Sequence, residues 1–311
     1  MNNKFSLAFY NLENFFDTKN DPNTFDDAFT PKGIMHWVAK RYFNKSKKIG
    51  FVISRLGLEE TDISPAFIGL GEVENKRVLK DLIQSKYLKK LPYDFVHYDS
   101  EDRRGMDVAL LYRKDMVQVL ESNTYPVILY KNDGTAYKSR DILYVKARLD
   151  KQIFHLFINH WPSRREGDRE SDNKRLKAAQ YLRELINYIS YEEDNAKIVV
   201  LGDFNTDPDD QNIESELVHP DLFNPAKRTF QKGNGSLRHQ KVWHLFDQIM
   251  LSRNFISGQA GFAFSSFNIF KPDYLKVWHG KYKNIPFRTY KGTKYQNGYS
   301  DHFPVYCVLE K

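Results

Sequence analysis

The sequence predicts an α/β fold in which two mixed β-sheets pack face to face and helices cover their outer surfaces. Short apolar runs of strand length outnumber segments with helical spacing by more than two to one, which a strictly alternating β/α barrel does not accommodate. Two of the runs, Ile142–Leu149 and Ile153–Asn159, are joined by Asp150-Lys151-Gln152 and are typical of a hairpin. Antiparallel pairing is therefore expected beside any parallel strands, in a sandwich of four layers.

The predicted strands share a composition that favours a pleated, buried surface. Each is rich in β-branched or aromatic residues and is bounded by charged residues, glycine or proline. In chain order they are Phe5–Tyr10, Ala66–Leu70, Asp107–Tyr112, Ile142–Leu149, Ile153–Asn159, Lys197–Leu201, Leu245–Leu251 and Phe303–Leu309.

Three longer segments carry apolar residues at the spacing of a helix that packs on one side. They cover residues 37–56, 78–87 and 176–189, and the last runs directly into the strand Lys197–Leu201. Their apolar side chains are expected to be core contacts with no functional role.

The remaining composition predicts one domain over residues 1–311, because no repeat, low-complexity tract or Pro/Ser-rich linker divides the chain. The single cysteine, Cys307, is expected to be a buried thiol, and no internal disulfide can form. No window approaches the ~18 apolar residues of a membrane span, and the N-terminal apolar stretch is too short for a signal peptide. A cytoplasmic monomer is therefore expected.

The net charge of +7 suits an anionic partner, although the excess is spread thinly along the chain.

Polar residues recur where the predicted strands end. Because strands hold such residues rigidly at one edge of a sheet, they are expected to converge in a single crevice. Together they have the composition of a metal-dependent phosphodiesterase site. The residues are Asn11, Glu72, His160, Asp203 with Asn205, and Asp301 with His302.

The acidic loop after Leu201 has three interpretations. Its acidic and amide residues match the first, third, fifth and twelfth positions of a calcium-binding EF-hand loop, but Pro208 stands where that loop needs glycine, and a strand precedes it. In a strand-end site, Asp203 would orient and deprotonate a water while Asn205 held a phosphate oxygen. A solvent-exposed turn of Asp and Asn residues is the remaining interpretation.

Glu72 follows the buried strand Ala66–Leu70, where a carboxylate is costly unless it is solvated, paired or bound to a metal. Oxygen donors without a cysteine cluster favour a hard cation such as Mg²⁺, with Mn²⁺ and Ca²⁺ as alternatives. Glu72 could instead be an N-terminal acid of the helix that begins near Asn75, a role that suits Glu74 better.

The order of these segments resembles that of the endonuclease/exonuclease/phosphatase superfamily, whose fold is that of deoxyribonuclease I. The resemblance extends from Asn11 to His302, and its most specific parts are Gly202-Asp203-Phe204-Asn205 and Ser300-Asp301-His302. The segment 245–250 resembles the family's Asp-Tyr-Ile-Phe stretch, with Gln248 in place of the usual aromatic residue.

The resemblance implies a role for each residue. Glu72 would bind the metal, with Asn11 close by and Asp301 contributing. Asp203 and Asn205 would position the attacking water and the scissile phosphate.

The histidines would complete this site. His302, held in one tautomer by Asp247, would act on the phosphate or the water, and His160 would stabilise charge on the phosphoryl oxygens. Arg140 matches, less securely, a family arginine that contacts phosphate.

The substrate is left open between nucleic acid and a phosphorylated sugar, inositol or lipid. Arg164 and its basic neighbours form a rim beside His160 that would contact nucleic acid, although interleaved acidic residues also suit a solvated loop. Residues 261–299 mix aromatic and basic side chains, as a groove for single-stranded nucleic acid would, or as an insertion with aromatics packed inward. We expect a non-specific or structure-selective endo- or exonuclease as the first candidate and a phosphatase or phosphodiesterase on small or lipid phosphates as the second.

Overall fold

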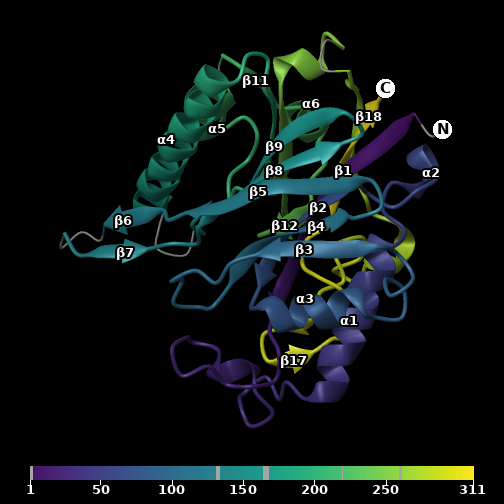
Figure 1. Cartoon of the computed structure of the whole chain (residues 1–311). Helices are drawn as coiled ribbons and strands as arrows, with labels where there is room; N and C mark the ends of the chain where they lie inside the picture. Colours follow the sequence, from purple (N-terminus) through teal and green to yellow (C-terminus); the bar gives the residue numbers. More distant parts are fainter. Residues whose placement is uncertain (1–2, 131–133, 164–167, 219, 259–260) are drawn as a thin grey trace.

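The computed structural model describes residues 3–130, 134–163, 168–218, 220–258 and 261–311, and it confirms the α/β fold with two mixed sheets (Figure 1). Each sheet has six strands. The first contains, in spatial order, β15 (Ala263–Ile269), β18 (Val305–Glu310), β1 (Lys4–Phe15), β2 (Phe67–Val73), β4 (Asp107–Arg113) and β3 (Tyr93–His97).

The second sheet contains β11 (Leu222–Phe223), β14 (Asp247–Ser252), β10 (Lys197–Asp203), β9 (Gln152–His160), β8 (Ile142–Leu149) and β5 (Val117–Tyr125). Within each sheet one central pair is parallel, β1 with β2 and β10 with β9. The predicted hairpin of β8 and β9 is antiparallel. The parallel pairs matter for function because their carboxyl ends carry most of the predicted site residues.

Helices lie outside the two sheets. In Figure 1, α4 (Asp168–Glu192) covers the second sheet, while α1 (Ala39–Ile53) and α3 (Lys76–Ile83) lie on the far side of the first. The shorter helices and turns are α2 (Leu58–Thr61), α5 (Gln211–Ile213), α6 (Ala226–Gln231), η1 (Asp27–Phe29), η3 (Glu214–Val218), η4 (Arg253–Phe255) and η5 (Asp273–Leu275). Among the described residues, none of the helices has both the length and the apolar composition needed to cross a bilayer.

Three short hairpins lie outside the two six-stranded sheets. They pair β6 (Ile128–Tyr130) with β7 (Ala136–Lys138), β12 (Leu237–His239) with β13 (Val242–His244), and β16 (Tyr290–Lys291) with β17 (Lys294–Tyr295). In Figure 1 the first of them extends below α4.

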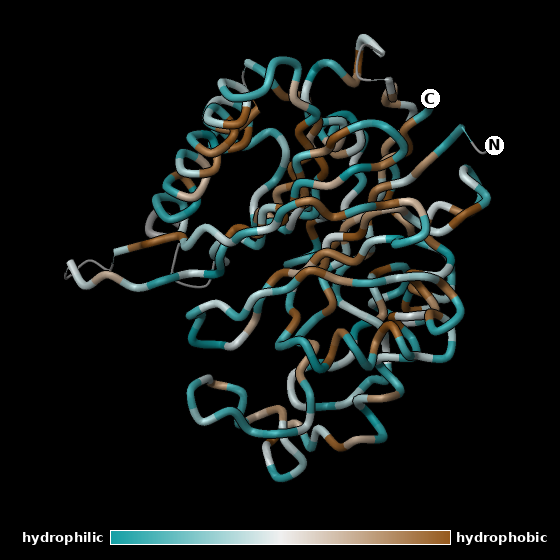
Figure 2. Tube along the Cα trace, viewed as in Figure 1, coloured by the Kyte–Doolittle hydropathy of each residue, from teal (hydrophilic) through white to brown (hydrophobic). Residues whose placement is uncertain are grey.

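Three apolar layers hold the structure together, and Figure 2 shows them as hydrophobic segments along the strands with polar loops at the periphery. The middle layer lies between the sheets and includes Phe9, Leu110, Leu156 and Leu201, each fully buried. The outer layers join α1 and α3 to the first sheet and α4 to the second. Cys307 is buried in the middle layer, as predicted.

The aromatic residues of segment 261–299 mostly pack inward. Phe262 and Tyr290 are buried, and Phe264 and Phe267 pack against the middle layer. Trp278 is 76% exposed and is the main exception. The described residues of segment 261–299 therefore do not form an open aromatic groove along its whole length.

The structure corrects several predicted boundaries. Strand β1 continues to Phe15, so Asn11 lies inside it, and Glu72 lies inside β2. Helix α3 ends at Ile83, because its predicted extension to Tyr87 consists of turns. The half-exposed strands β3, β5 and β15 were missed, since their residues do not form continuous apolar runs.

Gly202 in β10 faces the backbone of Asn159 in β9, and a Cβ at this position would collide with the Asn159 carbonyl oxygen and lie 2.8 Å from the Asn159 Cβ. Neither backbone can move without disturbing the ladder. We expect Gly202→Ala to lower the free energy of unfolding by about 1–3 kcal/mol, measured by urea denaturation. A variant as stable as the wild type would show that the two strands can separate at this point.

Candidate active site

Asp203 lies at the centre of the candidate site, at the edge of the second sheet where β9 and β10 end and β14 begins. In the β10 register it stands opposite His160 of β9 and opposite Asp247 of β14. Asn11 of the first sheet donates a hydrogen bond from Nδ2 to Asp203 Oδ2 at 2.9 Å, and His160 Nε2 lies 3.8 Å from the same oxygen. The carboxylate therefore links the two sheets.

Burial raises the pKa of Asp203 to about 6. The charge of His302 and hydrogen bonds from the Asn205 N–H and the Asn11 amide oppose this rise, while Asp247 adds to it. A carboxylate with this pKa is mostly ionised at neutral pH and is a stronger base than an exposed aspartate.

Asn205 closes the loop after β10. Its φ of 51° is in the left-handed region, which asparagine tolerates better than most residues. This conformation lets its backbone N–H donate to Asp203 Oδ1 at 3.0 Å, while its side-chain Nδ2 donates to the Trp161 carbonyl at 2.9 Å. The predicted pair of Asp203 and Asn205 is therefore one preformed unit.

Asp247 and His302 form a buried dyad beside Asp203. His302 Nδ1 lies 2.7 Å from Asp247 Oδ2, and the same oxygen accepts a short hydrogen bond from Ser236 Oγ. Ser300 Oγ accepts a hydrogen bond from the His302 N–H and donates one to the Asn11 carbonyl at 2.7 Å. Burial alone would lower the pKa of His302, but the charge and hydrogen bond of Asp247, together with the charges of Asp203 and Asp301, raise it well above the ordinary value.

Glu72 is positioned by an irregularity in β2. The β1–β2 register shifts between Asn11 and Phe15, and Glu72 itself has a φ of 58°. Its Oε2 accepts a hydrogen bond from the Asn14 N–H at 2.6 Å. Bulges and positive φ at residues other than glycine are often found at functional sites, because they re-aim a side chain. The helix that follows is capped by Asn75, not by Glu72.

A second buried carboxylate, Glu13, was not anticipated from the sequence. Its two oxygens accept hydrogen bonds from Arg288 Nε at 3.0 Å and from the Thr289 N–H at 2.6 Å. Arg288 also donates to Asp301 Oδ2 at 2.9 Å. Lys45 donates to the Glu13 carbonyl, and burial lowers the pKa of Lys45 to about 8.

Arg288 thus balances two carboxylates, and its removal should destabilise the fold in a pH-dependent way. Burial and then Asp301 raise the pKa of Glu13, while burial would raise that of Asp301 but Arg288, His302 and Lys45 hold it low. Without Arg288, the ionised form of both acids becomes less favourable in the folded state.

The native state of Arg288→Ala should therefore lose more stability at pH 8, where both acids are charged, than at pH 5. The expected deficit is about 1–2 kcal/mol at pH 8, since Arg288 is half exposed. Urea denaturation at both pH values measures it, with Arg288→Lys as the charge-preserving control. A deficit that does not change with pH would contradict this account.

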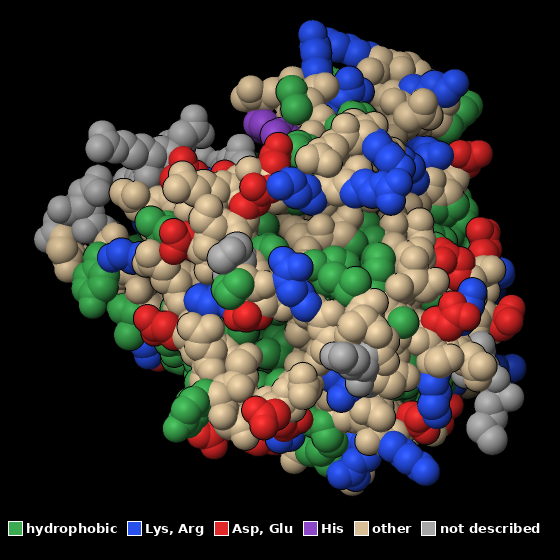
Figure 3. Space-filling view, turned by 90° about the horizontal axis from the view of Figure 1, so that it is seen from above, with side chains coloured by type: hydrophobic (Ala, Val, Ile, Leu, Met, Phe, Trp, Pro, Cys, Tyr) green, Lys and Arg blue, Asp and Glu red, His purple; other side chains and the backbone are tan. Residues whose placement is uncertain are grey.

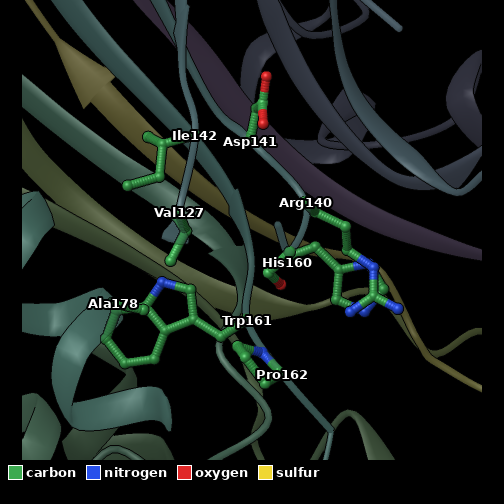
Figure 4. Close-up of a pocket in the computed structure, with 9 residues that line it drawn as sticks. Val127, Arg140, Asp141, Ile142, His160, Trp161, Pro162 and Ala178 are labelled. Atoms are coloured by element: carbon green, nitrogen blue, oxygen red, sulfur yellow. The ribbon is translucent and has the colours of Figure 1, made fainter. Parts of the chain in front are cut away.

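Arg140 and His160 line one small buried space with Val127, Trp161 and Pro162, and Figure 4 shows the guanidinium beside the imidazole. Arg140 is 7% exposed, and its Nε has no hydrogen-bond partner among the described residues. Burial lowers its pKa, and the charges of Asp102, Glu72 and Asp203 offset this lowering only in part. A buried cation with an unused donor suits an anionic ligand.

Among the residues that the sequence singled out, the structure brings Asn11, His160, Asp203, Asn205, Asp247 and His302 into one contact network, with Asp301 next in the chain. Glu72 and Arg140 are close enough to interact electrostatically. Arg164 lies outside the described residues. The EF-hand alternative fails on geometry as well as sequence, since Asp207 turns away from Asp203 to meet His244 Nδ1 at 2.7 Å.

The donors of this site fit a hard divalent cation. Asp203, Asp247 and His302 place potential ligand atoms within 4.8 Å of one another, but the raised pKa of His302 leaves a proton on each of its ring nitrogens, so this cluster does not suit the metal. Across the crevice, only Oε2 of Glu72 accepts a hydrogen bond from another described residue, so Oε1 is available to bind a metal ion. Carboxylate and amide oxygens of this kind are preferred by Mg²⁺ and Mn²⁺.

Comparisons with known proteins bear on the fold and the family of the chain. The structure of a humanised TDP2 of D. rerio with 14 mutations is 18% identical, covers 99% of this chain and 100% of its own, and superposes with a TM-score of 0.58. D. rerio TDP2 complexed with single-strand DNA product is 16% identical, with 99% of both chains covered and a TM-score of 0.58. A mannosyl-6-phosphatase of Bacteroides thetaiotaomicron VPI-5482 is 16% identical, covers 99% of this chain and 100% of its own, and has a TM-score of 0.60.

At these identities the structural likeness demonstrates a common fold and nothing finer. No curated protein is similar enough in sequence to count as a match. The profile of one family, however, matches residues 6–311, which is nearly the whole chain. The chain therefore belongs to the endonuclease/exonuclease/phosphatase family.

Proposed function

We propose that this protein is a divalent-metal-dependent phosphodiester hydrolase that cuts nucleic acid, as a non-specific or structure-selective endo- or exonuclease. The observation that carries the proposal is the position of Asp203, which accepts a hydrogen bond from Asn11 on one sheet and lies level with His160 and Asp247 on the other. A water held there would have a base on one side and cationic or donor groups on the other.

Asp203 would act as the base. It would take one proton from the water as the water oxygen bonds to phosphorus and the bond to the leaving oxygen breaks. Its pKa of about 6 suits this role near neutral pH. No covalent nucleophile is needed.

The cationic side chains would stabilise the charge that spreads over the phosphoryl oxygens. His302 is held as an imidazolium by Asp247, so it can donate a hydrogen bond from Nε2 to the phosphate. His160 and Arg140 would approach from the other side of the crevice.

Glu72, Asn11 and Asp301 would hold the metal ion, which would neutralise phosphate charge and stabilise the leaving oxygen. Asn11 has a further role, because its amide already bridges Asp203 and the Glu13 N–H. Asp301 has Arg288 as a cationic partner, so it is expected to contribute less than Glu72.

Nucleic acid is favoured as the substrate by the net charge of +7 and by the arginine at the crevice. Over the face seen in Figure 3, Lys and Arg side chains alternate with acidic ones, so charge supports this choice only near the site. A phosphatase acting on a sugar phosphate is the second candidate, because the mannosyl-6-phosphatase is as similar in fold as TDP2.

The test is turnover with Mg²⁺ on plasmid DNA, single-stranded DNA, an abasic duplex, RNA, inositol phosphates and mannose 6-phosphate. Nicking or shortening of nucleic acid that stops with EDTA, and in both Asp203→Ala and His302→Ala, would support the proposal. Phosphate release from the sugar or inositol phosphates alone would keep the mechanism and replace the substrate.

A further inference from the structure

A cleft of about 290 Å³ opens beside Arg140 and has a strongly cationic lining. Five of its lining residues are basic and one is acidic, whereas the whole chain has 47 basic and 40 acidic residues. The basic residues are Arg103, Arg104, Lys138, Arg140 and Lys174. Positive charge, which acidic residues nearly balance over the whole chain, is therefore in clear excess in the lining of this cleft.

The cleft is assembled from segments far apart in the sequence. Arg103 and Arg104 belong to the loop between β3 and β4, Lys138 ends β7, and Lys174 lies in α4. Lys174 Nζ is 5.1 Å from the ring centre of Tyr137, which also lines the cleft. An aromatic ring among cations offers a face for a base or sugar beside donors for phosphate.

The cations differ in how far they are already neutralised. Arg104 donates to the Asn14 amide oxygen at 2.8 Å, which is a neutral partner, and Lys138 forms a short ion pair with Glu101, an exposed residue outside the lining. Arg103 is exposed, and its side chain has no hydrogen bond or ion pair among the described residues. Buried Arg140 also lacks a carboxylate partner in the described part of the chain. The lining therefore has unmatched positive charge at both its inner end and its rim.

Arg140 connects this cleft to the candidate active site, because it also lines the space that contains His160. A phosphate at Arg140 and His160 would thus have its neighbour in the chain within reach of Arg103 and Lys138. We propose that the cleft is a second phosphate subsite, which holds the phosphate adjacent to the scissile one in a single strand of nucleic acid. This rests on the proposed function, and it predicts a preference for substrates with several phosphates.

The size of the cleft limits the ligand. At about 290 Å³ it lies at the lower end of small-ligand pockets, which suits one nucleotide unit and excludes a duplex. An unpaired strand end or a single-stranded stretch is therefore the expected substrate.

The experiment compares two substrates with the Mg²⁺-loaded full chain. One is a single-stranded trinucleotide, and the other is bis(p-nitrophenyl) phosphate, which has one phosphate. The variant is Arg103→Ala combined with Lys138→Ala at the rim. The control is Lys114→Ala combined with Lys151→Ala, which also removes two exposed positive charges. Lys114 follows β4 at the end remote from Glu72, and Lys151 precedes β9, nine residues and about 30 Å along the strand from His160.

We expect the double variant to lose about 10–100-fold in kcat/KM on the trinucleotide relative to bis(p-nitrophenyl) phosphate, mainly through KM. The control variant should behave as wild type on both substrates. Equal losses on the two substrates, or no loss on either, would overturn the subsite while leaving the hydrolase proposal intact.

A binding measurement separates the subsite from the reaction. Wild type and the double variant are titrated with a fluorescent tetranucleotide over a range of salt in EDTA. Each lost phosphate contact should reduce the slope of log K against log salt by about 0.7. If the wild type hydrolyses neither substrate, the proposed function fails, and this slope alone decides the subsite: an unchanged slope would overturn it.

Discussion

Asp203→Asn is expected to lower kcat by about 10²–10⁴-fold with little change in KM, because the amide cannot accept a proton from water. Asn keeps the shape of the side chain, and its single amide oxygen can still accept one of the two hydrogen bonds that Asn11 and Asn205 donate to separate oxygens of Asp203. Steady-state kinetics on the best substrate of the panel measures the effect.

The same variant has a pH signature in stability. Burial raises the pKa of Asp203 from 3.8 to about 6, so its neutral form favours the folded state and that contribution is lost as pH rises through about 6. The wild type should therefore lose stability relative to Asp203→Asn between about pH 4 and pH 7 in EDTA. If the free energies of unfolding of the wild type and Asp203→Asn changed with pH in parallel, or if the variant kept a kcat near the wild-type value, Asp203 would not be the base.

Asp247→Asn is expected to reduce kcat by about 10²–10⁴-fold through His302 rather than through direct contact with water. Burial would lower the pKa of His302, but Asp247, with smaller contributions from Asp203 and Asp301, raises it well above its ordinary value. In the variant, burial is no longer opposed by this partner, so the His302 pKa should fall. Histidine NMR titration follows it directly.

The stability of Asp247→Asn relative to the wild type should change with pH in the same sense as that of Asp203→Asn, but at higher pH. A raised histidine pKa contributes stability that is fully present below about pH 6.5 and is lost as pH rises through the folded pKa. The deficit of the variant should therefore be largest at low pH. Asp115→Asn, at an exposed carboxylate bonded to Arg113, serves as the control and should leave kcat unchanged. An unshifted His302 titration in the Asp247 variant would contradict the dyad.

Much of the fold was predictable because buried strands appear in the sequence as continuous apolar runs. Strand β10 and its partners β9 and β14 were identified in this way, and so was the position of Asp203 at their common end. The candidate site residues were singled out because polar residues at the ends of such strands have few structural reasons to be there, and their chemical roles stay predictions.

The unpredicted parts depend on contacts between distant segments. Arg288 and Glu13 are separated by 275 positions, so no local pattern relates them. A signal for Glu13 did exist, because Leu12 and Phe15 on either side are buried and continue β1 beyond Asn11. Polar residues in the bulged end of that strand concealed the continuation. The cationic cleft likewise draws on four separate segments, none of which is strongly basic alone.

The order of the strands has a consequence for biosynthesis. The second sheet is contributed by residues 117–252, whereas the first sheet combines the early strands with β15 and β18 from the end of the sequence. His302 and Asp301 immediately precede β18, which pairs with β1. A chain still emerging from the ribosome can thus form the whole second sheet before Asp301, His302 and β18 have been synthesised. The proposed hydrolytic site would therefore be assembled late, on a second sheet that has already formed.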